Sequence, residues 1–118
     1  YNTKILSKTG LGDEDFFYGP EDIELSYRLK KNGKLFVNQK AIAFHKIATS
    51  SSISGVKNRT FQSTYGFLKL IEKNGNKSDK LIGYLYFILR LLYYKFIKQK
   101  EYYAGYSFAL KKFFFNKT

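Results

Sequence analysis

The second half of the chain carries its apolar residues at the spacing of amphipathic helices. Three stretches have this pattern, and they cover residues 55–74, 80–98 and 102–115. Asn74-Gly75-Asn76 separates the first two stretches, and Ser78 or Asp79 is placed to cap the second. The pattern therefore predicts three consecutive helices in this half.

The first half predicts one further helix, over residues 21–32, which Gly33 ends as a C-cap. Its apolar positions do not form one clean stripe. Leu25 and Leu29 are four residues apart, and Asp22 shares their face. This spacing predicts that Asp22 points inward, toward whatever the helix covers.

Two short apolar runs follow, Leu35-Phe36-Val37 and Ala41-Ile42-Ala43-Phe44, with Asn38-Gln39-Lys40 between them. Short apolar runs on either side of a polar turn are typical of a β-hairpin. Ile5 and Leu6 predict the end of another strand. Together these elements predict an α/β chain that is mostly α-helical, with a short β-hairpin and three or four helices.

The chain has 118 residues, enough for one small domain, and contains no Cys, which excludes disulfides and thiolate metal sites. Its net charge of +12 is divided unevenly. Residues 1–45 hold seven Lys and Arg against six Asp and Glu, whereas residues 46–118 hold fourteen against three. The composition of the first part is therefore typical of a functional site. That of the second part is typical of a surface that binds an anionic partner, either a membrane leaflet or a nucleic acid.

The stretch over residues 80–98 is the most apolar part of the chain, but Arg90 and Lys95 interrupt it. It falls short of a transmembrane span, which needs roughly 20 apolar residues. It fits either a helix lying in a membrane interface, with both charges snorkelling to water, or an ordinary core helix. The consecutive residues 113–115, all Phe, predict contact with a partner, a membrane or a second copy of the chain.

Six carboxylates lie between Asp13 and Glu24, against the basic trend of the whole chain. Such a cluster indicates a metal site, a proton-transfer site or a site for a hydroxyl-rich ligand. The plainer interpretation is a solvated helix start, since acidic residues are stabilised near a helix N-terminus. The one His, His45, fits either a ligand or a partly buried side chain with a hydrogen-bond partner.

The segment GDEDFFYGPEDIELSYRL at residues 12–29, followed by Asn32-Gly33 and by Ala41-Ile42-Ala43-Phe44-His45, resembles the C-terminal half of family 2 glycosyltransferases of the GT-A fold. Those enzymes carry a Phe-Asp-Glu-x-Phe-Phe segment, a Glu-Asp pair, an Arg on the helix that follows, and an apolar strand ending in His. Lys57-Asn58-Arg59 extends the resemblance. The resemblance is closest over residues 10–45. It indicates the enzyme family but not which sugar is transferred.

The resemblance implies a role for each matching residue. Asp22 corresponds to the catalytic base, which takes the proton from the acceptor hydroxyl, and Glu21 would orient the acceptor or the base. Asp13 and Glu14 match the segment that lines the acceptor side. His45 matches a histidine that in some relatives reaches the metal or the diphosphate.

Arg28, in the same comparison, is expected to hold its helix by a salt bridge. The resemblance also divides the chain into an acceptor-side part of the catalytic domain, residues 1–54, and a basic, aromatic helical region, residues 55–118.

The implied full-length enzyme inverts the anomeric centre as it moves a sugar, of hexosyl or rhamnosyl type, from a nucleotide-sugar donor to a glycan or lipid-linked acceptor. The nucleotide-binding half and the Asp-x-Asp that holds Mg²⁺ or Mn²⁺ are expected before Tyr1. These 118 residues alone are therefore expected to be inactive and to bind no ion tightly.

We expect a cytoplasmic enzyme held peripherally at the inner face of the cytoplasmic membrane by residues 55–118, with a homo-oligomer as a further expectation. The alternative is a non-catalytic basic module that binds nucleic acid or an anionic membrane. Nucleic acid is not expected as a partner, because the aromatic residues lie at helical spacings typical of a core.

Overall fold

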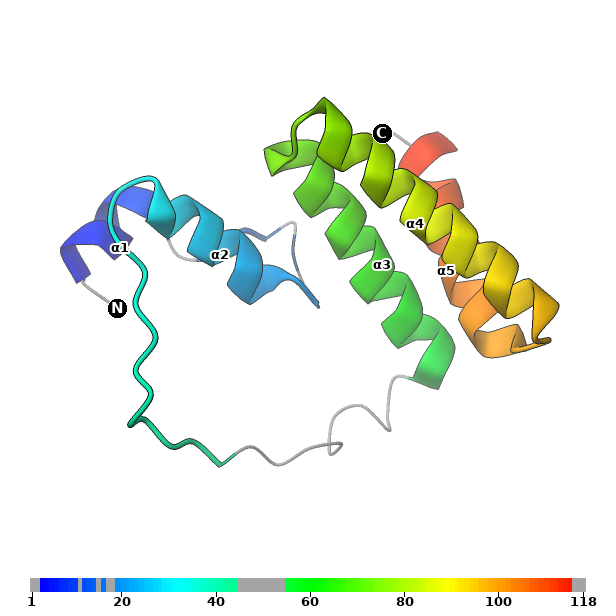
Figure 1. The fold of residues 1–118 in the computed structure, drawn as a ribbon, viewed down its shortest axis with the longest axis horizontal. Helices are drawn as coiled ribbons and strands as arrows, with labels where there is room; N and C mark the ends of the chain where they lie inside the picture. Colours follow the sequence, from blue (N-terminus) through cyan, green and yellow to red (C-terminus); the bar gives the residue numbers. More distant parts are fainter. Residues whose placement is uncertain (1–2, 11, 15, 17–18, 45–54, 116–118) are drawn as a thin grey trace.

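A computed structural model describes residues 3–10, 12–14, 16, 19–44 and 55–115 of the chain. Figure 1 shows α3, α4 and α5 side by side as a three-helix bundle, with α1 and α2 on the other side of α3. The five helices are α1 (Thr3–Thr9), α2 (Glu21–Lys30), α3 (Gly55–Asn74), α4 (Lys77–Phe96) and α5 (Lys100–Phe115).

The core of the molecule lies between α3, α4 and α5. Leu68 of α3 and Ala109 of α5 are completely buried, and Phe87, Tyr106 and Phe113 pack around them. Apolar burial of this kind supplies most of the stability of short helices, which are marginal in isolation. The prediction of three consecutive helices in this half is confirmed, and α3 has the predicted bounds.

The contact between α3 and α5 depends on Gly105. A Cβ atom at this position would lie 2.6 Å from Cβ of Thr60 and 2.7 Å from the carbonyl oxygen of Lys57. Both atoms belong to α3 and cannot move without the helix. Glycine therefore allows the two backbones to approach each other at this point.

The start of α4 is set by Asn76. Its side chain accepts a hydrogen bond from the backbone N–H of Asp79, and the Asp79 carboxylate accepts one from the backbone N–H of Asn76. This reciprocal pair is a capping box. The helix begins at Lys77, so the cap is Asn76 rather than the predicted Ser78 or Asp79.

Arg90 lies on the inner side of α4 and does not snorkel outward. Its Nε donates to the hydroxyl of Tyr106 at 3.2 Å, and its Nη2 donates to the hydroxyl of Tyr94 at 3.2 Å. The hydrogen bond to Tyr106 raises the pKa of Arg90 above its usual value. Within the described residues, no helix is both long enough and apolar enough to cross a membrane.

The predicted β-hairpin is wrong, and the described residues contain no strand. The runs 35–37 and 41–44 are extended but unpaired, and Phe36, Val37, Ile42 and Phe44 are between 84% and 100% exposed. A two-stranded hairpin is marginal in water unless it packs on something else, and most side chains of these runs are exposed. Only the turn survives, with the backbone N–H of Ala41 donating to the Asn38 carbonyl at 3.2 Å.

The strand predicted at Ile5 and Leu6 is also wrong, since both residues lie in α1. This helix packs beside α2, where Cδ1 of Ile5 lies so close to Gly33 that a Cβ there would meet it at 2.9 Å. Two apolar residues in a row fit a helix face as well as a strand, and no strand of the described chain is present to pair with them. The chain is therefore all-helical in its described part, and the α/β fold class is corrected accordingly.

Candidate functional site

The acidic residues at the start of α2 are divided between the surface and the interior. Glu21 and Asp22 occupy the first turn and are exposed, next to the buried Pro20. Glu24 is only 1% exposed, and Leu29 is buried with it. The prediction that Asp22 points inward is therefore wrong: the inward face of α2 passes through Glu24 and Leu29 instead.

Asp22 borders a cavity of about 340 Å³ on the outer side of α2. The lining includes the hydroxyl-bearing residues Ser26 and Tyr27, together with Lys30 and Leu35. Ile23 also contributes, and the exposed lining is mainly apolar, with one carboxylate, two hydroxyls and one ammonium group that could form hydrogen bonds with a hydroxyl-rich ligand. Asp22 is thus reachable by a ligand from solvent, which a proton-transfer group requires.

Arg28 ties the acidic helix to the loop before it. Its Nε donates to both carboxylate oxygens of Glu24, at 2.8 and 2.9 Å, and its Nη1 donates to the carbonyl oxygens of Thr9 and Gly10, at 2.7 and 3.4 Å. The expected salt bridge of Arg28 is therefore confirmed. Because the Glu24 carboxylate is buried and paired, α2 is held in one orientation relative to the loop that follows α1.

Asp13 is tied to α3, since its carboxylate accepts a hydrogen bond from Nζ of Lys73. The same Nζ lies 4.0 Å from Glu24 and over the ring of the buried Phe16, 5.8 Å from its centroid. Glu14 is exposed. The structure thus brings Asp13 and Glu24 together around Lys73, while Glu14, Glu21 and Asp22 remain at the surface.

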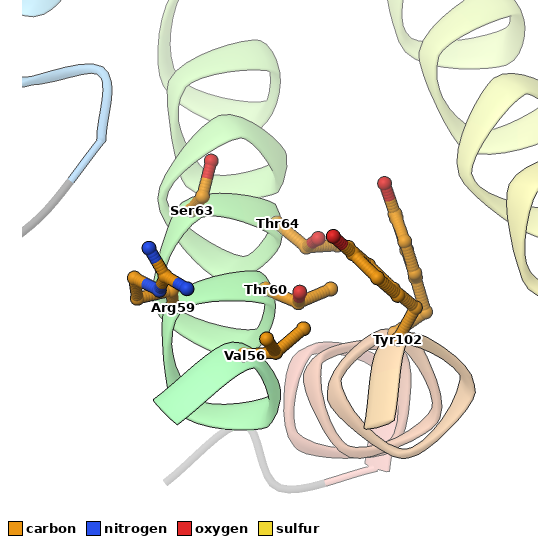
Figure 2. A pocket seen from close by; sticks show the side chains of 7 residues that line it. Val56, Arg59, Thr60, Ser63, Thr64 and Tyr102 are labelled. Atoms are coloured by element: carbon orange, nitrogen blue, oxygen red, sulfur yellow. The ribbon is translucent and has the colours of Figure 1, made fainter. Parts of the chain in front are cut away.

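A second cavity, of about 320 Å³, lies between α3 and the start of α5. Figure 2 shows Thr60 and Thr64 on the side of α3 that faces Tyr102, and Arg59 on the opposite side. The cavity is lined by Val56, Arg59, Thr60, Ser63, Thr64, Tyr102 and Tyr106. Its character is polar, with several hydroxyls and one guanidinium group.

Gly19 connects this cavity with the acidic helix. It has φ of +121°, and a Cβ atom there would lie 3.1 Å from Cα of Ser63. Both the conformation and the close approach require glycine. The chain therefore reaches α3 at Ser63, beside the cavity, and begins α2 only two residues later at Glu21.

The metal role of His45 concerns a residue outside the described part of the chain. Among the residues that the structure describes, no three His, Cys, Asp or Glu side chains are grouped so that they could hold a metal ion. Asp13 and Glu24 are instead engaged by Lys73 and Arg28. The described residues thus do not fit a divalent ion by themselves.

The polar cavity beside α3 was not predicted from the sequence. The signal for it is the placement of Thr60, Ser63 and Thr64 at positions i, i+3 and i+4, which groups three hydroxyls on one face of α3. Hydroxyl residues are common on solvent-facing helix surfaces, so this signal alone does not identify a cavity. Comparison with protein-family models, curated proteins and solved structures found no match for this chain.

Proposed function

We propose that this chain is the acceptor-side part of an inverting glycosyltransferase, similar to those of family 2, which transfers a sugar from a nucleotide donor to a glycan or lipid-linked acceptor. The observation that carries the proposal is the acidic segment from Asp13 to Arg28. In it, the exposed Asp22 borders a mainly apolar cavity that includes two hydroxyl residues, while the ion pair of the buried Glu24 with Arg28 holds the helix that presents it.

In the proposed reaction, Asp22 acts as the general base. Its carboxylate accepts the proton of the acceptor hydroxyl while that oxygen forms a bond to the anomeric carbon of the donor sugar. The bond from this carbon to the nucleotide diphosphate breaks, and the electron pair leaves with the phosphate oxygen. Attack from the face opposite the leaving group inverts the anomeric centre.

The neighbouring residues position the acceptor. Glu21 lies beside Asp22 in the first turn of α2, where it accepts a hydrogen bond from a second hydroxyl of the acceptor. Asp13 and Glu14 lie on the preceding loop, whose orientation depends on Lys73 and Arg28. These contacts are proposed to fix the angle at which the acceptor reaches Asp22.

The donor side of the reaction is assigned to residues outside this chain. A divalent ion, Mg²⁺ or Mn²⁺, supplies charge stabilisation to the leaving diphosphate in such enzymes. The described residues contain no group of three ligands for such an ion. His45 remains a proposed contact to that ion.

We further propose that the enzyme works at the cytoplasmic face of the membrane, held there peripherally by residues 55–118. This region has thirteen Lys and Arg against three acidic residues, Glu72, Asp79 and Glu101. An anionic leaflet attracts basic residues near its surface by about 1 kcal/mol each. A lipid-linked acceptor would be met at the same surface.

The test is a transfer assay with the full-length protein, a panel of nucleotide sugars and a lipid extract as acceptor, in buffer with Mg²⁺ or Mn²⁺. Release of the nucleotide and transfer of radiolabelled sugar into the lipid fraction are measured together. The proposal predicts that one donor supports both, in a fixed ratio. No transfer from any donor, in a protein that is folded by circular dichroism, would contradict it.

A second function, binding of nucleic acid, is favoured by one observation, the excess of basic residues after residue 45. It predicts salt-dependent binding of single-stranded nucleic acid that Asp22→Asn leaves unchanged. Three of the aromatic residues in this region, Phe87, Tyr106 and Phe113, are buried in the bundle and so cannot stack on bases.

A further inference from the structure

The outer surface of α4 is apolar along almost the whole length of the helix. Nine apolar or aromatic side chains between Leu81 and Phe96 are exposed, by 41% to 86%. At about 100° per residue they fill one continuous arc of about 160°. A monomeric soluble protein rarely exposes an apolar surface that is both contiguous and this long.

Polar side chains border this surface without interrupting it. Arg90, the one charge in the middle of the helix, is turned inward to Tyr94 and Tyr106. Lys77 and Lys95 are both exposed and are eighteen residues apart, which is five full turns, so they lie along the same margin of the apolar arc. Tyr86 and Tyr93 lie near the opposite margin, each about half exposed.

Figure 1 shows α4 on the outer side of the bundle, away from α1 and α2. The inner side of the helix, with Phe87, packs on the core. No described segment of the chain covers the outer side.

We propose that the outer surface of α4 is a docking surface for an anionic lipid bilayer, on which the helix lies parallel to the membrane plane. This proposal rests on the membrane location in the proposed function and names the surface responsible. The apolar arc enters the acyl boundary, the tyrosines lie at the depth of the headgroups, and Lys77 and Lys95 contact lipid phosphates.

Charge decides between a bilayer and a second copy of the chain. Residues 46–118 carry an excess of eleven positive charges, and a second copy would place an equal excess against the first. An anionic leaflet complements that charge. No helix in the described part of the chain is both long and apolar enough to cross the bilayer, which is consistent with a position in the interface.

The experiment is vesicle co-sedimentation of the full chain, without any sugar donor. Two kinds of vesicle are compared, phosphatidylcholine alone and phosphatidylcholine mixed with phosphatidylglycerol. We expect binding to the mixed vesicles that weakens with salt, and little binding to the neutral ones. Leu89→Glu, at a side chain 63% exposed in the middle of the arc, is expected to weaken binding by roughly tenfold or more.

The matched control is Ile42→Glu, the same kind of change at a side chain that is 84% exposed but lies outside the bundle. It should bind as the parent does. Lys77→Gln and Lys95→Gln should each weaken binding by about fivefold. Circular dichroism checks that each variant keeps its helix content, which exposed positions on α4 should preserve.

Three results would overturn the proposal: no binding to mixed vesicles, equal loss in Ile42→Glu and Leu89→Glu, or a lipid-free dimer that Leu89→Glu converts to a monomer. The last result would assign the surface to a second copy. Asp22→Asn is included as a further arm and should bind vesicles like the parent. The docking surface and the sugar-transfer site can therefore fail separately.

Discussion

Replacing Glu24 by Gln is expected to loosen the acidic segment while leaving the three-helix bundle intact. The Glu24 carboxylate is 1% exposed and accepts Nε of Arg28 at 2.8 and 2.9 Å, with Nζ of Lys73 4.0 Å away. The variant leaves two cations beside a neutral amide. Arg28 keeps its contacts to the Thr9 and Gly10 carbonyls, but these carry no full charge.

The size of the effect follows from the burial of the pair. Removing one partner of a fully buried ion pair costs about 3–5 kcal/mol. The Arg28 side chain is 20% exposed and the amide of Gln retains one acceptor, so we expect a smaller loss, about 2–3 kcal/mol. The loss falls on the docking of α2 against α3 and against Thr9 and Gly10.

The assay is hydrogen exchange of backbone amides. A loss of 2–3 kcal/mol corresponds to exchange that is roughly 30- to 150-fold faster in α2, with little change in α3 to α5. The control is Glu101→Gln, which removes an exposed carboxylate from the first turn of α5 and should leave all rates nearly unchanged. If α2 exchanges equally fast in Glu24→Gln and in the parent, the buried pair does not hold the segment.

Two further predictions concern the bundle. Gly105→Ala should lower the free energy of unfolding by about 1–2 kcal/mol, because its methyl group meets the α3 backbone. Gly83→Ala should be close to neutral, because the atom that its methyl group meets, 2.6 Å away, is the flexible Cδ1 of Ile71. Urea unfolding of both variants distinguishes them, and equal stability of the two would contradict the close approach of α3 and α5. Desolvation by burial, together with the hydrogen bond to Glu72, raises the pKa of Tyr84 from 10.0 to about 12. The folded chain therefore keeps this proton between about pH 10 and 12 while the unfolded chain loses it, so the free energy of unfolding falls as the pH rises across that window. Tyr84→Phe should remove this part of the pH dependence of stability. An unchanged pH dependence in the variant would refute the assignment.

The helices of the second half could be predicted because their burial is mainly apolar. In α3 and α5 the side chains with the right spacing, such as Leu68, Tyr106 and Phe113, are those that the structure buries. Capping was predicted only approximately, because Asn76, Ser78 and Asp79 are all good caps and the choice among them depends on where the preceding turn ends.

The inward face of α2 could not be predicted from the hydrophobic pattern, because this face contains a charged residue. The hydrophobic pattern counts Glu24 and Arg28 as polar, but the two charges pair at i, i+4, and the Glu24 carboxylate is buried while Arg28 stays partly exposed. The face was therefore assigned to Asp22. Arg90 shows the same effect in α4. The hydrophobic pattern would place its guanidinium group in water, but three tyrosines accept hydrogen bonds from this group or stack on it.

The β-hairpin could not be decided from the sequence, since a run of three or four apolar residues forms a strand only if a partner strand or a packing surface is available. In the described structure Phe36 and Phe44 have neither. The roles of Glu21 and Asp22 derive from the resemblance and not from any geometry predicted from spacing, so they stay predictions.

The central claim is that Asp22 is the base of a sugar transfer, and the most direct test is the turnover rate of Asp22→Asn in the full-length protein, at saturating donor and acceptor. Asn is nearly isosteric but accepts a proton poorly, and Asp22 is exposed, so the fold should be unaffected. We predict a loss of kcat of about 10²- to 10⁴-fold with little change in KM, and full activity in Glu101→Gln. An Asp22→Asn variant that turns over at the parent's rate would contradict the account.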